Sequence, residues 1–454
     1  MPSDRSGGHR PRPKSGPGRP PGGDRPRDRE FRDRGEFVRA RPGGERPPLA
    51  PQVLRQRALD VDPVEDAAVV VVKAPSPHPW VYRKRLGSIA ANARHGDIVQ
   101  LRLPDETCFG YGLFNPRAEI SARVLTRGEE YPTEAWFAER VRSAVALRRD
   151  WLGLEADTNA FRLVHAESDG LPGVVIDRLG PVISVEAFSL GMYQRAEALA
   201  QLACRTIGVT HWVVRPGSAT LDQEGFSGDV FSSADCPTKT SILEHGTRFE
   251  IDFASGHKTG FFCDQRENRR QLAEYARGRS LLDVCCYTGG FAVQAKRLGE
   301  ATEVTGVDLD ETAVRQARRN ANINQLDIRW VQADAFHYLR DMAAAGRQFD
   351  VVVLDPPKFI RSREERDAGR RKYYDLNRLA SAVVSPGGLL LTCSCSGLMT
   401  SEEFVRTVAS AVPADRRASL LARTGAASDH PVGLGCLETE YLHAAWVRMG
   451  DAAE

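Results

Sequence analysis

The stretch Leu281-Leu-Asp-Val-Cys-Cys-Tyr-Thr-Gly-Gly-Phe291 decides the fold. It joins a short apolar run, typical of a buried strand, to a glycine turn and the start of a helix. Because Gly289 and Gly290 lack a Cβ atom, the turn can tighten and a ligand can lie against its backbone. The N-terminus of the following helix faces that ligand. The stretch therefore predicts a strand–turn–helix unit that binds a nucleoside cofactor.

Around this unit, strand and helix patterns alternate from about Gly260 onward. Strands with intervening helices predict right-handed crossovers and a doubly wound, Rossmann-like α/β sheet, whose ligands bind outside the carboxyl ends of the strands. The predicted strands are 281–284, 303–308, 328–332, 350–354 and 388–394, and the predicted helices are 266–276, 290–298, 311–323, 335–344 and 375–384.

Acidic residues end two further strands. Asp308 follows Gly290 by 18 residues, the position of an acid that binds ribose hydroxyls. A glycine turn with a downstream acid also occurs in dinucleotide dehydrogenases, but the missing G-x-G-x-x-G pattern disfavours a dinucleotide. Asp334 ends the third strand and is placed to contact an adenine amino group. A helix N-cap is the alternative role for Asp334, and the two roles are compatible.

The segment Asp355-Pro-Pro-Lys-Phe359 predicts a clamp for a planar base. Pro356 and Pro357 fix their φ angles and remove two backbone donors, which leaves carbonyl groups directed into the cleft. With Asp355, these carbonyls can accept hydrogen bonds from an exocyclic amine, while Lys358 and Phe359 contact the substrate. The alternative is an ordinary stop between a strand and a loop.

Two thiols lie at a third strand end, in Thr392-Cys-Ser-Cys-Ser-Gly397. Because Cys393 and Cys395 alternate across a strand end, we expect them to point to opposite faces, one to the core and the other to the cleft. A thiolate that adds to C6 of cytosine would make C5 able to attack an activated methyl group. Buried packing is the alternative for either thiol. No metal site is predicted, because no second cysteine pair or histidine cluster has zinc spacing.

The first 50 residues contain 13 Lys and Arg, 7 Asp and Glu, and almost no aliphatic residues, so their net charge is +6 against +2 for the whole chain. We predict a disordered Arg/Gly/Pro tail over 1–55, because such a composition cannot bury enough apolar surface to fold. The tail is either an arm that binds RNA phosphates or a solubilising extension.

Short strands at 67–72, 96–103, 110–114 and 118–125 predict a small β-barrel over residues 66–127. Basic Arg83, Lys84 and Arg85 beside Trp80 suit an RNA-contacting face. The alternative is a core tryptophan with a solvated basic turn.

An α+β domain is predicted over 133–255, and the Rossmann-like domain over 256–450. The middle domain begins with a helix at 133–149, and its other predicted elements are strands at 161–164, 173–177, 182–188 and 211–215, a helix at 192–207 and a hairpin over 244–253.

The composition narrows the class of protein. No run of about 18 apolar residues occurs, so no membrane partner is expected, and no apolar stretch near the N-terminus indicates a secretory signal. The nine cysteines are odd in number, and Cys285 and Cys286 are adjacent, which favours reduced thiols and a cytoplasmic location.

Together these motifs make the chain resemble, from Val69 to Met449, the bacterial large-subunit rRNA cytosine-C5 methyltransferases that carry an N-terminal PUA domain. Besides the three strand-end segments, the matching motifs are His78-Pro-Trp80, Gly112-Leu-Phe-Asn-Pro116, Asp169-Gly-Leu-Pro-Gly-Val-Val-Ile-Asp177, Lys258-Thr-Gly-Phe-Phe262, Asp264-Gln-Arg-Glu-Asn-Arg269 and Asp429-His-Pro431.

The resemblance implies a class I fold, large-subunit rRNA as partner, a PUA barrel at 66–127 and an RNA-docking middle domain. It implies Cys395 as nucleophile, with Asp355 beside it in catalysis. The cofactor it implies is S-adenosylmethionine, and the residues we assign to it are Asp264, Gln265, Asp283, Tyr287, Thr288, Gly289, Gly290, Asp308, Asp334 and Asp355.

One departure from the wider RNA cytosine-C5 group leaves alternatives open. Many of those enzymes carry a second cysteine after the Asp-x-Pro turn, where this chain has Pro357 and Lys358. The base that removes the C5 proton is therefore unassigned. Methylation of an amino group or ring nitrogen, as in guanine, remains an alternative, as does a non-catalytic PUA-type RNA-binding or assembly factor. The modified nucleotide and the oligomeric state, including a homodimer, are not fixed by the sequence.

Overall fold

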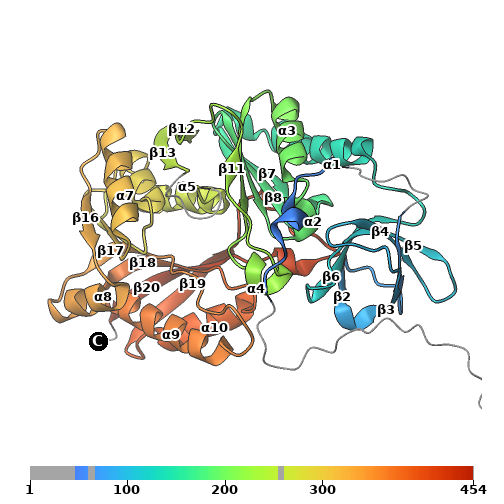
Figure 1. Cartoon of the computed structure of the whole chain (residues 1–454). Helices are drawn as coiled ribbons and strands as arrows, with labels where there is room; N and C mark the ends of the chain where they lie inside the picture. The colour runs from blue at the N-terminus through green and yellow to red at the C-terminus, as the bar shows by residue number, and fades with distance from the viewer. Residues whose placement is uncertain (1–46, 60–66, 254–259, 453–454) are drawn as a thin grey trace, which may run out of the picture. The chain divides into compact units, whose positions relative to one another are not determined.

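The computed structural model describes residues 47–59, 67–253 and 260–452 (Figure 1). Most of the predicted tail, residues 1–46, lies outside the described residues. Its end was placed too late, because Pro51–Leu54 form a 3-10 turn that belongs to the folded part. There the Leu49 amide donates to the Gly225 carbonyl at 2.8 Å, and Leu49, Val53 and Leu54 pack against the core of the middle sheet. Aliphatic side chains at 49–54 therefore tie this segment to the fold.

The N-terminal sheet has six strands in the order β2-β6-β5-β4-β1-β3, in which β1 and β4 pair in parallel and the other pairs are antiparallel. Strands β2 and β3, on either side of the 3-10 turn Arg83–Arg85, were missed by the sequence patterns because they span only three and four residues. The strands are β1 Val69–Val72, β2 Trp80–Tyr82, β3 Leu86–Ile89, β4 Ile98–Arg102, β5 Cys108–Phe114 and β6 Ile120–Arg127.

The middle sheet has five strands in the order β11-β10-β9-β8-β7. The single helix expected at 192–207 is two helices, because Arg195 leaves the helical conformation (ψ 3°), and the first helix continues as a π-turn at Leu147–Trp151. The expected hairpin is present as β12 and β13. The elements are α1 Glu134–Ala146, β7 Ala160–His165, β8 Val174–Leu179, β9 Val182–Ala187, α2 Leu190–Tyr193, α3 Ala196–Ile207, β10 His211–Pro216, α4 Thr220–Glu224, β11 Phe231–Ser232, β12 Lys239–Glu244 and β13 Thr247–Asp252.

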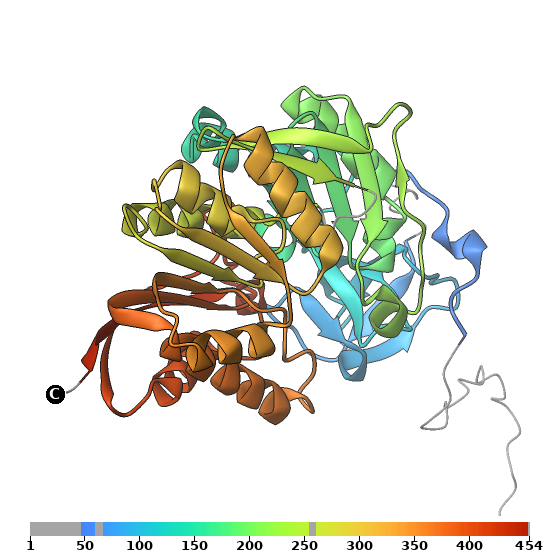
Figure 2. The same cartoon turned by 90° about the vertical axis from the view of Figure 1, so that its left-hand side faces the viewer.

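The C-terminal sheet has seven strands in the order β16-β15-β14-β17-β18-β20-β19, and an α-helix follows each strand from β14 to β18 along the chain (Figure 2). The five strands β14 to β18 are parallel, and β20 runs antiparallel to both β18 and β19. The elements are α5 Arg266–Tyr275, β14 Leu281–Val284, α6 Gly290–Arg297, β15 Val304–Asp308, α7 Glu311–Ile323, β16 Arg329–Gln332, α8 Ala335–Ala344, β17 Phe349–Leu354, α9 Arg366–Ala382, β18 Val384–Ser394, α10 Ser401–Ala411, β19 Arg416–Thr424 and β20 His443–Ala452.

The Rossmann-like α/β fold expected from the sequence is thus confirmed. Alternate residues of β17 point to opposite sides of the sheet: Val351 and Val353 belong to one buried cluster, Val352 and Leu354 to the other. Because both faces are covered, the carboxyl ends of the strands form the edge at which ligands bind. None of the helices in the described ranges is long and apolar enough to cross a bilayer.

Candidate active site

The turn after β14 holds three residues in the left-handed region: Cys285 (φ 61°), Tyr287 (φ 48°) and Gly289 (φ 81°). A Cβ atom at Gly289 would come within 2.5 Å of Trp330, so no other residue fits there. The Tyr287 amide donates to Asp308 Oδ2 at 2.8 Å, which fixes the strained turn to the end of β15. Strain that the surrounding structure maintains is typical of a ligand-binding site.

Three carboxyl groups, those of Asp283, Asp308 and Asp355, lie at neighbouring strand ends. Asp283 is fully buried; its Oδ2 accepts from the Ala292 amide at 3.0 Å, and its Oδ1 has no hydrogen-bond partner. Burial, reinforced by the charges of Asp355 and Asp308, raises the pKa of Asp283 to about 8. Within the described residues, no basic side chain forms an ion pair with Asp283 or Asp308. The carboxyl groups at this edge of the sheet therefore favour the binding of a cation.

The end of β17 is tied to the segment before α5. Gln265 Nε2 donates to Asp355 Oδ2 at 3.0 Å, and the Asp355 amide donates to the Val284 carbonyl. Pro356 is buried, whereas Pro357 and Lys358 are exposed. Phe359 is half-buried and packs edge-on against Tyr373, with ring centroids 4.9 Å apart. Contact of these four residues with a substrate stays a prediction.

The two thiols of the third segment differ in exposure. Cys393 is fully buried, and Cys395, which directly follows β18, is half-buried. The expectation that they face opposite sides was wrong: both pack on the same core cluster, since residues two apart on a strand share a face. Burial, and then the charge of Asp355, raises the pKa of Cys393 well above its usual range. Cys393 is therefore a protonated core thiol.

Ser396 joins the thiol segment to the proline segment. Its Oγ accepts from the Ile360 amide at 3.2 Å and lies 3.0 Å from the Tyr373 hydroxyl. The Ser396 hydroxyl thus holds the Cys395 loop beside the loop after Asp355 and beside α9, a contact that the sequence patterns did not reveal.

Asp334 is the N-cap of α8, which was one of the two roles expected for it. Its carboxylate accepts from the His337 amide at 3.1 Å and pairs with His337 Nδ1 at 3.0 Å. The hydrogen bond from the His337 amide is the main cause that lowers the pKa of Asp334. Its contact with adenine stays a prediction, as do the cofactor contacts of Thr288 and Gly290, which are both half-buried at the turn.

Asp264 has a partner far away in the chain. The Tyr441 hydroxyl donates to Asp264 Oδ2 at 2.6 Å, and the Ala427 amide donates to the Asp264 carbonyl. Burial, and then the charge of Asp264, raises the pKa of the Tyr441 phenol well above its usual range. Sequence reasoning missed Tyr441, because a contact across 177 residues leaves no local pattern.

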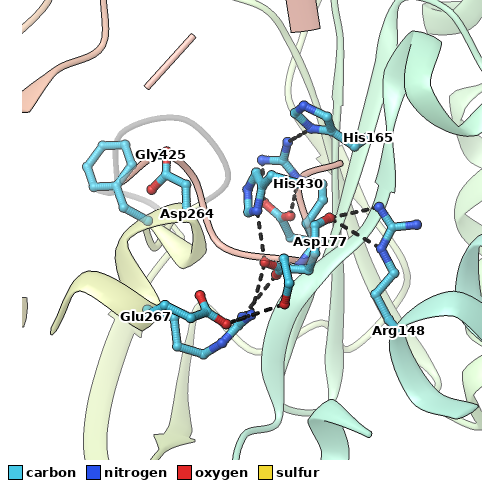
Figure 3. A network of polar contacts seen from close by, with 12 residues as sticks. Arg148, His165, Asp177, Asp264, Glu267, Gly425 and His430 are labelled. Atoms are coloured by element: carbon cyan, nitrogen blue, oxygen red, sulfur yellow. Dashed lines mark hydrogen bonds and ion pairs between the residues drawn. The ribbon is translucent and has the colours of Figure 1, made fainter. Parts of the chain in front are cut away.

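A buried network of ion pairs joins the middle sheet to the C-terminal domain (Figure 3). Its centre is Asp429, whose carboxylate binds Arg266 with two 3.0 Å hydrogen bonds, His430 at 2.9 Å and the Arg162 amide at 2.7 Å. The Asp429 carbonyl accepts from Arg148 at 2.7 Å. Burial alone would raise the pKa of Asp429, but His430 and Arg266 outweigh it and hold that pKa well below its usual range.

The predicted RNA-contacting residues lie on β2 and the turn after it. The Trp80 indole donates to Glu167 Oε1 of the middle domain at 2.8 Å, while its ring is half-buried. The guanidinium groups of Arg83 and Arg85 bind loop carbonyls, and Lys84 is exposed. Contact of these four residues with RNA stays a prediction.

Among the described residues, one group has metal-ligand chemistry: atoms of His78, Cys436 and Glu438 lie within 4.8 Å of one another. However, His78 Nδ1 accepts from the Trp80 amide at 3.0 Å, so the proton of the neutral ring lies on Nε2. Nε2 then donates to Glu438 Oε2 at 3.1 Å. The group is better explained as a hydrogen-bonded contact between domains than as a metal site.

Known proteins share the two domains and the fold described above. Residues 174–423 match the family model described as S-adenosylmethionine-dependent methyltransferase, and residues 73–127 match that of a PUA-like domain. A putative SAM-dependent methyltransferase from Streptococcus mutans has a TM-score of 0.71 at 19% identity, covering 84% of this chain and 99% of its own. A putative methyltransferase solved in complex with SAH gives 0.68 at 19% identity, with the same coverage. At this identity the two structures support the fold alone.

The chain is therefore an S-adenosylmethionine-dependent methyltransferase with a PUA-like domain. It is 37% identical over 381 residues to ribosomal RNA large subunit methyltransferase I of Aeromonas hydrophila, and 38% identical over 386 residues to that of Tolumonas auensis. Each alignment covers 82% of this chain and 95% of the relative. The chain belongs to the ribosomal RNA large subunit methyltransferase I family.

The strand-end carboxylates fit this cofactor. S-adenosylmethionine carries a sulfonium and an ammonium group, and a positive charge nearby would offset the burial and the carboxylate repulsion that together raise the pKa of Asp283. The buried Asp283 Oδ1, which has no hydrogen-bond partner, is an acceptor suited to such a cation. The sequence thus predicted a cofactor for which the structure supplies a matching charge.

Proposed function

We propose that this protein methylates C5 of a cytosine in large-subunit rRNA through a covalent bond between Cys395 Sγ and C6 of the base. The observation that carries the proposal is the contrast between two thiols, since Cys393 is sealed in the core while Cys395 is half-buried beyond the end of β18. Strand β18 pairs in parallel with β17, which places Cys395 beside the segment that begins at Asp355. The names of the relatives support rRNA as the substrate.

The chemistry follows from the weak nucleophilicity of C5 in cytosine. Addition of the Cys395 thiolate to C6 gives C5 enamine character, and C5 then takes the methyl group. S-adenosylmethionine supplies that methyl group in electrophilic form. Loss of the C5 proton to a base restores the double bond and expels the Cys395 thiolate. The sulfur is unchanged at the end of the cycle.

The remaining residues hold the reactants. Asp308 and the turn at Tyr287–Gly289 hold the cofactor's nucleoside, while Asp283 and Asp355 face its positive charges. The carbonyls of Pro356 and Pro357, with Asp355, hold the exocyclic amine of the base. The other proposed cofactor contacts are Asp264, Gln265, Thr288, Gly290 and Asp334; the other proposed RNA contacts are Lys358, Phe359, Trp80, Arg83, Lys84 and Arg85. A substrate in the ribosome implies a cytoplasmic location.

The test compares Cys395→Ala with the matched variant Cys393→Ala. Large-subunit rRNA is incubated with each variant and S-adenosylmethionine, and its nucleosides are identified by mass spectrometry. We expect 5-methylcytidine with the native chain, none with Cys395→Ala and a retained product with Cys393→Ala. Undiminished turnover by Cys395→Ala, or a methyl group on a nitrogen atom, would contradict covalent C5 chemistry. Either result would support methylation of an amino group or ring nitrogen. That alternative is compatible with Pro357 at the position where related enzymes carry a second cysteine.

A further inference from the structure

The turn Gly433–Cys436 presents an apolar side chain to solvent. Leu434 is 94% exposed, the largest exposed fraction among the large hydrophobic side chains in the part of the chain that the structure describes. The Cys436 amide donates to the Gly433 carbonyl at 2.8 Å, so Leu434 and Gly435 are the two central residues of a β-turn. Such positions are normally filled by Gly, Pro, Asn, Asp or Ser. A leucine that breaks this local preference indicates a functional constraint.

The turn is held firmly on both sides. Asp429 and His430 before it are buried in the ion-pair network, and Cys436 and Thr439 after it are buried as well. The Gly433 amide donates to the Thr439 hydroxyl at 2.9 Å. Exposed Val432 (40%) and Leu437 (62%) flank the turn. The segment therefore alternates buried anchors with exposed aliphatic groups, so it presents an apolar tip on a rigid base.

The tip lies where the domains meet the reactive segments. Glu438 binds His78 of the PUA-like domain, and a Cβ atom at Gly433 would lie 3.3 Å from Ser168 of the middle domain. Tyr441, at the end of the segment, contacts Asp264, and a Cβ atom at Gly397, two residues after Cys395, would lie 3.8 Å from the Tyr441 side chain.

One basic group lies near the tip, because a Cβ atom at Gly435 would lie 3.9 Å from the Pro77 carbonyl, to which Arg127 donates. Arg127 binds the carbonyls of Ser76 and Pro77, next to His78. Burial raises the pKa of Tyr82; among the nearby charges, Glu438 raises it further and Arg363, from the loop after Phe359, lowers it, so each of these two charges acts on Tyr82. An apolar tip with a guanidinium group near it matches a nucleic acid, whose phosphates bind the cation while its bases accept the aliphatic group.

We propose that Leu434 inserts into the base stack of the RNA substrate beside the target nucleotide and holds that nucleotide out of the stack. This inference rests on the proposed function, because a base must leave its stack before Cys395 can reach C6. Aliphatic wedges that unstack neighbouring bases are a general means of deforming nucleic acids.

The test compares Leu434→Ser with Leu434→Met and with Leu421→Ser, a matched change at an exposed leucine (50%) of edge strand β19. Methyl incorporation is measured on large-subunit rRNA transcribed in vitro, together with the melting temperature and calorimetric S-adenosylmethionine affinity of each variant. We expect Leu434→Ser to lose at least about fivefold in kcat/KM, with cofactor affinity and melting temperature unchanged. Leu434→Met and Leu421→Ser should keep the native rate.

Each other outcome has a distinct meaning. A native rate for Leu434→Ser, with methylation by the native chain intact, would overturn the wedge and leave the proposed function standing. A loss confined to assembled ribosomal particles would overturn it in favour of a protein partner, and a change in molecular mass on light scattering would favour a second copy of this chain. Failure of the native chain to methylate rRNA would instead refute the proposed function and the wedge with it.

Discussion

Two regions of this molecule bury carboxylates, and they treat the charge in opposite ways. In the network around Asp429, each acidic side chain meets an arginine: Arg266 binds Asp429, Arg148 binds Asp169, and Arg162 binds Asp177. At the strand ends, Asp283 and Asp308 have no such partner among the described residues, and the pKa of Asp283 rises to about 8 as burial and the neighbouring carboxylates disfavour its charge. The paired carboxylates join the domains, whereas we propose that the unpaired ones bind the cationic cofactor.

The largest effect should come from breaking a matched pair. Asp429→Asn leaves the guanidinium group of Arg266 buried and uncompensated, and we expect the free energy of unfolding to fall by about 3–5 kcal/mol. Urea denaturation measures it. The control is Glu402→Gln, which breaks the exposed pair with Arg406 and should cost less than about 1 kcal/mol. If Asp429→Asn lowered the free energy of unfolding by as little as the control does, the network would add nothing to stability.

At the unmatched edge, a substitution should cost affinity more than stability. Asp308→Ala removes a half-buried carboxylate that we propose binds the ribose hydroxyls, and we expect S-adenosylmethionine affinity to fall by about 10–100-fold. Because Asp308 also accepts from the Tyr287 amide, the melting temperature of the cofactor-free variant is recorded alongside calorimetry. Undiminished binding would refute its role at the ribose.

The pH dependence of binding should reveal the unmatched charge directly. With a pKa of about 8, Asp283 is mostly protonated at pH 6–7 in the cofactor-free protein, and a bound cation favours its ionised form. Binding then releases a proton, so affinity should rise with pH below 8, by at most about tenfold per pH unit. Calorimetry from pH 6 to 7.5 measures this slope, which Asp283→Asn should flatten. An equal slope in that variant would assign the proton to another group.

The smallest effect should come from removing the basic residues before position 47, which belong to neither region. Residues 1–46 contribute +6 to a chain of net charge +2. Their removal should weaken RNA binding mainly at low salt, because the contribution is counterion release. Filter binding across a salt series measures it, and an identical salt slope without the segment would show that it does not contact RNA.

Local signals decided which parts of the fold could be predicted. Helices α7 and α8 were predicted to the residue, and in the structure Asp310 and Asp334 are their N-caps, so a local side-chain signal marks where each begins. Helix α9 begins at Arg366, well before the expected start, since its first half is polar and lacks an apolar period. Helix α10 was not predicted, although its capping box, Thr400 with Glu403, was readable in the sequence.

Contacts between distant residues could not be predicted. The strand-end residues Asp308, Asp355 and Cys395 follow from the rule that parallel strands bring their carboxyl ends together. By contrast, the bond between Tyr441 and Asp264 and the role of Asp429 depend on how a loop near the C-terminus packs against the segment before α5 and against the middle domain. Asp429-His-Pro431 was noticed as a motif, but only the structure shows what its carboxylate binds.

The most direct test of the mechanism uses large-subunit rRNA transcribed with 5-fluorocytidine. Fluorine at C5 cannot leave as a proton does. A base that Cys395 has attacked at C6 and that has received a methyl group at C5 therefore stays bonded to the protein. The account predicts an RNA–protein adduct with the native chain, a digest that places the bond on Cys395, and no adduct with Cys395→Ala. A bond at Cys393, or an adduct that survives Cys395→Ala, would contradict it.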